Sequence, residues 1–577
     1  MSRHFGLFFT VVLFRLVAYG QTPTITANGI QDAATYTVDI APGSIFVVKG
    51  ANLSGGGFSQ ASFPLPTTLN EVQINFTPVS GGAAIPAYMV YTYNVSGVNQ
   101  LAAILPSTAA PGAYNVTVSR SGQVSAAQRA MVVARKFGLI TVDSTGSGLA
   151  VAQNFISAAQ LDLNRLTTGT VAGFTYSPAK PGQTIIAYGT GIGGLPSGAD
   201  NTAPGVVDFR GRVDVKVFVG GVTITPDYAG RAPQFPGEDQ VNFALPANVP
   251  TGCSVPFQVS VGGQFSNPTT LAIAPAGANA CVSSRFNEAV LSRLDQGGTF
   301  TTAEFILTTL ALKLSTAGIT IDSRTETAGG AFTKYTGAQL GSADLFFGPP
   351  DTCQFYRRRS DPNGLFGGLG INLNAGDSVR LTGPNNLNLP VERNRVDNSY
   401  FVSVTSPGVG TPSRKIVAGE YRLTSTQEVD VKAFQGIAIA GEPIQLSADL
   451  PATVSRSRDL TVSWSGPGPT DLVVVLGASG VAVAGTDPTI YDWGAFVCSA
   501  PADRKTFTVP ASILSQLPVT PPNGLITGTG LGELFVGSST RPVAGNGLFT
   551  AGLTAGGNVD NATFVVFSGS GTVTEYQ

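Results

Sequence analysis

The distribution of apolar residues along the chain predicts an all-β protein. Short runs of β-branched or alternating apolar residues are bounded by Gly, Pro, Asn or Ser, which is typical of antiparallel sandwiches. The clearest runs are residues 44–48, 114–118, 214–219 and 257–261. Helical periodicity is scarce, and residues 287–294 are the one segment for which we predict a short helix. Residues 302–314 fit either a helix or a strand, and we predict a strand because Thr and Phe recur there.

Three sequence landmarks recur in one order at a nearly constant spacing. Residues 42–50 recur at 181–189, residues 100–106 at 240–246, and residues 122–125 at 263–266, which are offsets of 139, 140 and 141. In each copy a Pro-Gly pair makes a turn and the apolar run after it is a buried strand. This repeat predicts two homologous modules, at residues 21–135 and 136–281.

The same residues carry a resemblance to a known family. They are PGSIFVVKGANL at 42–53, LPTTL at 65–69, PAKPGQTIIAYGTGIG at 178–193, VKVFVGG at 215–221, YAG at 228–230 and QVNFALP at 240–246. Together they resemble the Solibacter-type C-terminal domain, a repeated module of large exported acidobacterial proteins that is similar to IPT/TIG immunoglobulin-like domains. The resemblance covers about residues 40–275. It implies tandem immunoglobulin-like β-sandwiches and no catalytic residues. In this chain almost 300 residues follow the modules.

Strand patterns continue through the second half of the chain. They lie at residues 373–384, 417–424, 460–465, 472–477, 496–498 and 505–510. We therefore expect residues 282–577 to form a larger C-terminal β-sandwich region. A division into subdomains 282–440 and 441–577 is left open.

The N-terminus has the features of a secretory signal peptide. Arg3 and His4 give a positive start, residues 5–14 are mainly apolar, and residues 18–20 (Ala-Tyr-Gly) suit signal peptidase. The alternative is a membrane anchor, but this apolar run is shorter than the roughly 20 residues that span a bilayer. We expect residues 1–20 to be removed, no transmembrane span to remain, and the protein to be secreted or held at the cell surface.

Charge argues against nucleic acid as a partner. Charged residues are 12% of the chain, and the formal net charge is −2. Loss of Arg3 and Arg15 with the signal peptide would leave 31 basic against 35 acidic residues. That balance offers no attraction to nucleic acid or to an anionic membrane. The densest basic run, residues 357–359, is predicted to be the end of a strand. The 71 Gly and 38 Pro fit turns between short strands.

Four cysteines predict two disulfide bridges in an exported protein. Of the three possible pairings, Cys253–Cys281 with Cys353–Cys498 keeps each bridge inside one predicted domain. The chain contains no C-x-x-C sequence and no histidine after His4, so no zinc or other metal site is assigned. Residues 361–364 and 558–561 offer oxygen ligands for calcium, but neither matches a twelve-residue calcium loop.

The absence of histidine beyond His4 excludes the usual Ser-His-Asp and Cys-His systems and the H-E-x-x-H metalloprotease. Paired carboxylates, as in glycosidases, remain conceivable. The pairs considered are Glu238 with Asp239 and Glu428 with Asp430, and surface charge explains them equally well. No catalytic residue and no cofactor is assigned.

Aromatic residues supply the candidate binding site. Trp464 and Trp493 are the only tryptophans. Trp464 has the pattern of a sandwich core residue, whereas Trp493 lies in a turn-like stretch and is the candidate for an exposed sugar-stacking side chain. Strand alternation predicts Tyr91 and Tyr93 on one face and Tyr88 on the other.

These observations together predict a non-enzymatic exported protein, an adhesive, scaffold or interaction module built of β-sandwiches. Its partner would be an extracellular protein or a polysaccharide. Two alternatives remain open, a carbohydrate-binding protein that uses exposed aromatics and a glycosidase that uses two carboxylates.

Overall fold

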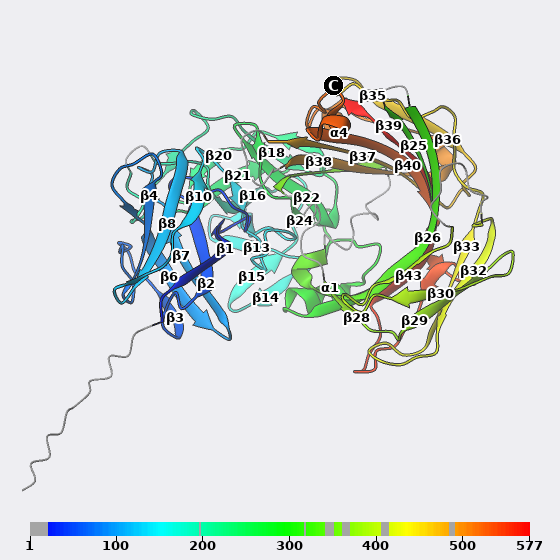
Figure 1. Ribbon diagram of the computed structural model, residues 1–577, viewed down its shortest axis with the longest axis horizontal. Coiled ribbons are helices and arrows are strands. Elements are labelled where there is room, and N and C mark those ends of the chain that lie inside the picture. The colour runs from blue at the N-terminus through cyan, green and yellow to red at the C-terminus, as the bar shows by residue number, and fades with distance from the viewer. Residues whose placement is uncertain are drawn as a thin grey trace, which may run out of the picture.

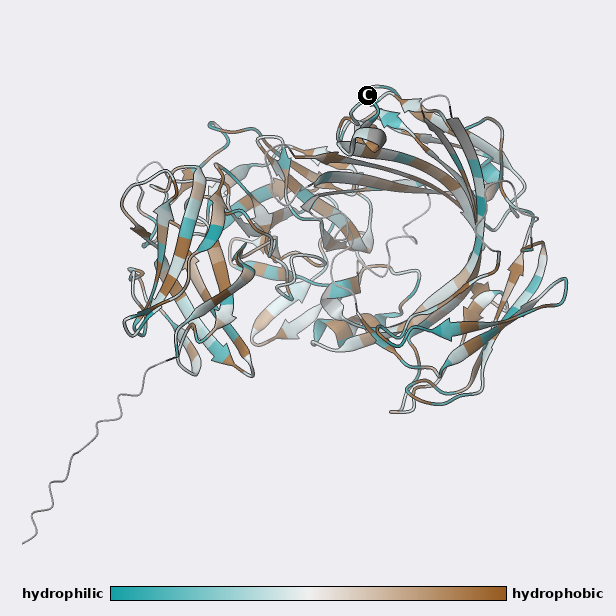
Figure 2. Ribbon diagram, in the orientation of Figure 1, coloured by the Kyte–Doolittle hydropathy of each residue, from teal (hydrophilic) through white to brown (hydrophobic). Residues whose placement is uncertain are grey.

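The computed structural model describes residues 21–195, 198–316, 319–340, 351–360, 370–405, 415–483 and 491–577. Strands form nearly all of the regular structure in these residues, which confirms the all-β prediction. Figure 1 shows the N-terminal modules packed together and a strongly curved sheet beyond them. In Figure 2 apolar and polar segments alternate along many of the strands, as expected for sheets with one face in a core. No helix in the described ranges is long and apolar enough to cross a membrane.

The first module is a sandwich of two sheets. One sheet has the order β1 (Thr24–Asp32), β2 (Ile45–Ala51), β7 (Val98–Ile104), β6 (Tyr88–Val95), β3 (Gly57–Gln60). The other has the order β10 (Gln128–Val132), β8 (Gly112–Arg120), β4 (Val72–Pro78), β5 (Ile85–Pro86), with β9 (Gln123–Val124) beside β8. Phe46, Met89, Phe76 and Val116 are fully buried between them. Strand β3 is therefore an edge strand, with β6 as its one neighbour in the sheet.

The second module is also a two-sheet sandwich. Its larger sheet has the order β14 (Gly169–Val171), β15 (Phe174–Ser177), β13 (Gln160–Asn164), β12 (Ala152–Ser157), β16 (Thr184–Thr190), β21 (Asp239–Ala244), β20 (Tyr228–Arg231), β17 (Val207–Asp208), with β11 (Gly138–Leu139) beside β16. The smaller has the order β19 (Val222–Ile224), β18 (Val215–Val219), β22 (Gly252–Val261), β23 (Gln264–Phe265), with β24 (Thr269–Ile273) beside β22. Equivalent positions of the sequence repeat are paired in the same way in the two modules. Ile45 lies opposite Ile104 in the first module, and Thr184 lies opposite Ala244 in the second.

The C-terminal region begins with helix α1 (Glu288–Asp295), at the place where a helix was predicted. The side chain of Asn287 caps it by accepting a hydrogen bond of 3.1 Å from the backbone N–H of Val290. The segment that fitted either helix or strand is β25 (Thr299–Thr316), which confirms the strand. It pairs along its whole length with β26 (Ile319–Thr336).

One long sheet organises this region. Its order is β27 (Thr352–Ser360), β38 (Tyr491–Pro501), β37 (Leu472–Ala482), β40 (Gly530–Ser539), β43 (Asn561–Val573), β25, β26, β31 (Tyr400–Ser403), β30 (Leu387–Arg393), β29 (Ser378–Gly383), β32 (Gly419–Ser425), β33 (Phe434–Ala440). Strands β28 (Ile371–Leu373), β41 (Val543–Ala544) and β42 (Gly547–Phe549) join its sides. Smaller elements are β34 (Gln445–Leu446), β36 (Leu460–Ser465) and β39 (Thr506–Val509), the pair β35 (Thr453–Val454) and β44 (Glu575–Tyr576), and helices α3 (Ala511–Leu514) and α4 (Gly524–Thr527).

Two hydrophobic cores lie against the long sheet. In one, Phe305 and Phe332 pack against Phe434, because the sheet folds back and places β29–β33 over β25 and β26. In the other, Trp464 of β36 packs with Phe496 of β38. Both cores draw residues from either side of position 440. The boundaries proposed from sequence remain predictions.

Both predicted disulfides are present. Cys253 is bonded to Cys281, and Cys353 is bonded to Cys498. The first ties β22 to the segment that leads into α1. The second joins residues that lie directly opposite each other on β27 and β38, so it staples one edge of the long sheet.

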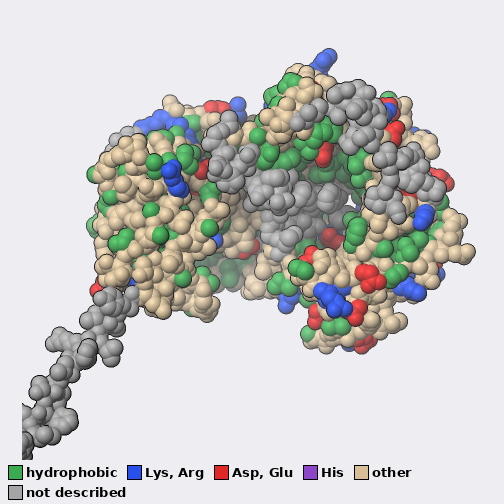
Figure 3. All heavy atoms as spheres, in the orientation of Figure 1, with side chains coloured by type: hydrophobic (Ala, Val, Ile, Leu, Met, Phe, Trp, Pro, Cys, Tyr) green, Lys and Arg blue, Asp and Glu red, His purple; other side chains and the backbone are tan. Residues whose placement is uncertain are grey.

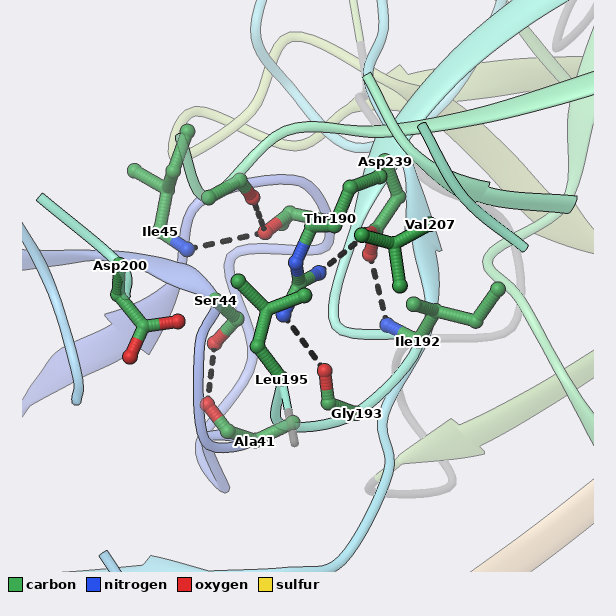
Figure 4. Close-up of polar contacts among 12 residues, drawn as sticks. Ala41, Ser44, Ile45, Thr190, Ile192, Gly193, Leu195, Asp200, Val207 and Asp239 are labelled. Atoms are coloured by element: carbon green, nitrogen blue, oxygen red, sulfur yellow. Dashed lines mark hydrogen bonds and ion pairs between the residues drawn. The ribbon is translucent and has the colours of Figure 1, made fainter. Parts of the chain in front are cut away.

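The two N-terminal modules meet in a joint of buried polar contacts (Figure 4). The Thr190 hydroxyl accepts a hydrogen bond of 2.9 Å from the backbone N–H of Ile45 in the first module and donates one of 2.6 Å to the carbonyl of Gly237. The carboxylate of Asp200 accepts hydrogen bonds of 2.6 Å from both the backbone N–H and the hydroxyl of Ser107. Directional contacts of this kind fix the orientation of one module on the other.

Candidate functional site

An exposed aromatic cluster lies on the outer face of the first module. Phe58 of edge strand β3 is directly opposite Tyr93 of β6, so the two side chains share a face. The Phe58 ring centroid is 6.3 Å from that of Tyr93 and 5.9 Å from that of Tyr91. Phe58 is 58% exposed, and the tyrosines are half-buried. We call Phe58, Tyr91 and Tyr93 the aromatic platform.

The prediction that Tyr91 and Tyr93 share a face is confirmed, but the opposite placement of Tyr88 is wrong. A β-bulge between Met89 and Tyr91 inserts one extra residue into β6. Tyr88 therefore lies opposite Ile104 while Tyr91 lies opposite Ala102, and positions 102 and 104 face the same way on β7. The extra residue reverses the alternation of side chains along β6 and brings all three tyrosines to one face.

Polar groups border the platform. Gln100 of β7 donates a hydrogen bond of 2.5 Å to the Tyr91 hydroxyl, and burial raises the pKa of that hydroxyl. Lys49 of β2 lies opposite Gln100, and its ammonium stands 4.8 Å above the Tyr36 ring. The face therefore combines flat apolar rings with hydrogen-bonding groups. In Figure 3 the visible side of the first module consists mostly of uncharged side chains and backbone.

A pocket of about 260 Å³ opens beside the platform at the edge of β3, and we call it the edge pocket. It lies between the two sheets of the sandwich. Its lining is Gly55, Gly56, Gly57, Phe58, Ser59, Asn70, Glu71, Thr92, Arg120 and Ser121. Phe58 belongs to both features, so the platform and the edge pocket are contiguous.

Two tight turns form one wall of the edge pocket. Asn70 and Glu71 have φ values of 50° and 63°, and Leu69 and Val72 exchange backbone hydrogen bonds of 3.0 and 2.9 Å around them. These are the features of a two-residue hairpin turn with both central residues left-handed. Ser121 and Gly122, with φ values of 48° and 83°, occupy the second turn. The Ser121 hydroxyl donates a hydrogen bond of 2.7 Å to Glu71 Oε2, which joins the turns.

Several polar atoms in the edge pocket retain hydrogen-bonding capacity. Arg120 donates one hydrogen bond, 3.1 Å from Nη1 to the carbonyl of Asn52. Asn70 donates a long one of 3.4 Å to the Thr92 hydroxyl. Within the described part of the chain, Glu71 Oε1, Asn70 Oδ1 and the Arg120 Nη2 group have no protein partner. The pocket thus offers both donors and acceptors to a ligand.

The two tryptophans lie elsewhere. Trp464 is buried and donates a hydrogen bond of 2.9 Å to the carbonyl of Ala502, as a core residue does. Trp493 is not in a turn, because it belongs to strand β38. Its ring lies against Gly480 of the neighbouring strand, where a Cβ would come within 2.5 Å of it. Its side chain is half-buried, and its ring centroid is 6.1 Å from that of Tyr491. A role for Trp493 in sugar stacking stays a prediction.

In the two candidate carboxylate pairs, the carboxylates of Asp239, Asp430 and Glu428 are engaged by protein donors. The buried Asp239 forms an ion pair with Arg231 in the joint, and its Oδ2 accepts a hydrogen bond of 2.7 Å from the Ile192 N–H. The Asp430 carboxylate accepts a hydrogen bond of 2.8 Å from the Asn374 N–H. Glu428 accepts one of 3.4 Å from the backbone N–H of Ala433, in the same loop between β32 and β33. These carboxylates hold the backbone in place.

The oxygens considered for calcium bind protein donors where they are described. Asp560 pairs with Arg293 at 2.6 Å and accepts a hydrogen bond of 2.9 Å from the Thr301 N–H. Residues 361–364 lie outside the described residues. Across the described ranges, no cluster of three or more His, Cys, Asp or Glu residues is placed to hold a metal ion.

Comparison with known proteins gives weak likenesses. No family model matches the chain, and no curated protein matches it. One similar solved structure is SGBP-B of the Bacteroides ovatus mixed-linkage glucan utilization locus, in complex with a mixed-linkage heptasaccharide. It is 10% identical in sequence, the match covers 85% of this chain and 91% of that one, and the TM-score is 0.14. The I67–I69 fragment of titin is 10% identical over 73% and 98%, with a TM-score of 0.12. The FN1–FN3 domains of chicken CNTN1 are 7% identical over 70% and 93%, with a TM-score of 0.11.

Proposed function

We propose that this chain is a non-catalytic, exported β-sandwich protein that binds a polysaccharide through the aromatic platform of its first module. The observation that carries the proposal is the exposed cluster of Phe58, Tyr91 and Tyr93 on one sheet face. Pyranose rings have an apolar face of C–H groups, which packs on the electron-rich face of an aromatic ring. An exposed cluster of such rings, bordered by polar groups, is typical of a recognition surface.

The surroundings of the platform suit a sugar ligand. Tyrosine presents a rigid apolar ring with a polar tip, so it loses little conformational entropy on binding. Gln100 and Lys49 lie in the same row of the sheet as Tyr93 and supply a donor and a cation at the border of the rings. These groups lie along one face of the sheet, which suits a ligand chain that spans several of them.

Export is supported by the two disulfides, since such bridges form in oxidising compartments. Together with the signal-peptide pattern at residues 1–20, this favours a secreted or surface-held protein. A role as an adhesive or scaffold that contacts another protein remains the second candidate, because the same rings could bury a protein side chain.

The test is retention of the full chain by a panel of polysaccharides. Cellulose, chitin and insoluble xylan would be used in pull-down assays, and mixed-linkage β-glucan, galactomannan and pectin in affinity electrophoresis. We expect at least one to retain the protein and Phe58→Ala to weaken that binding about tenfold or more, the cost of about 1.4 kcal/mol of lost contact. Release of reducing sugar is not expected.

A matched control exists in the second module. Phe174 of β15 is 62% exposed, close to the exposure of Phe58, but lies outside the platform. Phe174→Ala should leave retention unchanged. Equal losses for Phe58→Ala and Phe174→Ala, or no retention by any polysaccharide of the panel, would refute the proposed function and favour a protein partner.

A further inference from the structure

The edge pocket adds a second element to the proposed carbohydrate site. We infer that it receives a single neutral sugar residue, a branch or chain end of the polysaccharide whose neighbouring residues lie on the aromatic platform. This inference rests on the proposed function. The ligand is then a neutral glycan with a free branch or end, and the pocket lining takes part in selecting that glycan.

The dimensions of the pocket support one sugar ring. Sites for drug-sized ligands usually measure roughly 300–1,000 Å³. A pocket of about 260 Å³ is smaller than that, which suits a single sugar ring. Phe58 lines the pocket and also contacts Tyr91 and Tyr93, so the pocket and the platform meet at this residue of edge strand β3. A residue that projects from a chain stacked on the rings can enter the pocket.

The polar lining indicates a neutral ligand. Glu71 and Arg120 bring opposite charges to the same small volume. Their charges offset each other, so neither a uronate carboxylate nor the ammonium of an amino sugar gains a net electrostatic attraction to the lining. Hydroxyl groups both donate and accept, so a neutral sugar can satisfy Glu71 Oε1, Asn70 Oδ1 and Arg120 together.

The backbone at Glu71 gives an independent argument. A two-residue turn with left-handed central residues strongly favours Asn-Gly, because glycine adopts positive φ without strain. Asn70 fits this preference, but the second position holds Glu71 at φ 63°. Strain held at a residue whose side chain lines a pocket is typical of a functional position. The turn thus presents the Glu71 carboxylate to the pocket from a position that glycine would occupy with less strain.

This conflict makes Glu71→Gly a sharp test. The substitution removes the carboxylate and relaxes the turn, so stability should be equal or higher while sugar binding falls. Asn386→Gly is the matched control. Asn385 and Asn386 form a comparable pair, with φ values of 57° and 58°, between β29 and β30 and outside the edge pocket. Asn386→Gly should relax its turn by a smaller amount, because Asn tolerates positive φ better than Glu, and should leave sugar binding unchanged.

The measurement is saturation-transfer NMR on the full chain. The probes are free D-glucose, D-galactose, D-mannose, D-xylose and L-arabinose, with D-glucuronate and D-glucosamine as charged counterparts. We expect at least one neutral sugar to receive saturation, the charged sugars to receive little, and Glu71→Gly to reduce the signal about tenfold. Phe58→Ala should also reduce it, since Phe58 lines the pocket.

The outcomes separate the two proposals. If a polysaccharide is retained in a Phe58-dependent way but no free neutral sugar binds, or if Glu71→Gly binds as the wild type does, the pocket inference fails and the proposed function stands. A preference for glucuronate or glucosamine would also overturn the pocket inference. If neither polysaccharide nor free sugar binds, both proposals fall.

Discussion

Arg231 and Asp239 form an ion pair in which both side chains are fully buried. The two residues lie opposite each other on β20 and β21, at the joint between the N-terminal modules. Arg231 also donates a hydrogen bond of 2.5 Å to the carbonyl of Gly193. Burial raises the pKa of Asp239, and Arg231 acts in the opposite direction by stabilising the charged form.

Removing one member of this pair should be strongly destabilising. Arg231→Met leaves an unpaired buried carboxylate, and we expect a loss of about 3–5 kcal/mol in the free energy of unfolding. The double variant Arg231→Met with Asp239→Leu should lose less, because no charge is then left unpaired. Urea unfolding of the full chain, followed by a probe in the N-terminal modules, measures both.

An exposed ion pair provides the control. Arg210 and Asp208 are 2.7 Å apart, and their side chains are 41% and 33% exposed. Arg210→Met should cost less than about 1 kcal/mol, since solvent screens such pairs. Equal losses for Arg210→Met and Arg231→Met would contradict the structural role assigned to the joint.

Glu238 should make the joint sensitive to pH. Burial, with the neighbouring charge of Asp239, raises the pKa of Glu238 from 4.5 to about 7. A carboxyl group with a raised pKa in the folded state stabilises the fold in acid and loses that contribution as pH rises through the folded pKa. The pKa of the nearby Tyr188 is raised to about 12 by burial and by Glu238, so this tyrosine does not titrate in that range.

We therefore expect stability to fall between about pH 4.5 and about pH 7 and to level off above, with a total loss of about 1–2 kcal/mol once the partial exposure of Glu238 is allowed for. Glu238→Gln should abolish that part of the pH dependence and stabilise the protein at pH 8. Thermal unfolding of both proteins at pH 5, 6, 7 and 8 makes the comparison, with Glu392→Gln as an exposed control. Parallel pH profiles for wild type and Glu238→Gln would count against this prediction.

The strands could be predicted from sequence because alternation and turn residues are local signals. The helix at α1 and the strand β25 followed from the same reasoning. The cysteine pairing also followed, since it needed only the assignment of cysteines to regions. The helix and strand predictions depend on residues close together in sequence, and the cysteine pairing depends only on which region of the chain each cysteine belongs to.

The candidate site could not be predicted in the same way. Phe58 is separated by more than 30 residues from Tyr91 and Tyr93, and only strand pairing shows that they share a face. The bulge near Met89 has no local marker such as glycine, so simple alternation misplaced Tyr88. The sequence neighbours of Trp493 are typical of a turn, but strand pairing places it in β38 opposite Gly480. Non-local pairing, not composition, determines which aromatics meet.

The two disulfides should differ in their effect on stability. They span 28 and 145 residues, and in the chain-entropy model these loops correspond to about 3.6 and about 5 kcal/mol. Replacing Cys353 and Cys498 with Ser should therefore destabilise more than replacing Cys253 and Cys281. Urea unfolding of the two double variants ranks them, and peptide mapping of unreduced protein checks the pairing. Recovery of Cys253 linked to Cys353 would refute it.

Glu326 should anchor the chain segment at Lys415 and Ile416 in the C-terminal region. This fully buried residue of β26 accepts hydrogen bonds of 2.9 Å from the Lys415 N–H and 3.3 Å from the Ile416 N–H. Glu326→Leu leaves both donors without their acceptor, at a cost of about 1–3 kcal/mol each. Glu326→Gln keeps one carbonyl acceptor and should cost less. Hydrogen exchange at the amides of Lys415 and Ile416 should accelerate strongly in Glu326→Leu and only slightly in Glu326→Gln. If both variants exchange like the wild type, the carboxylate does not anchor this segment.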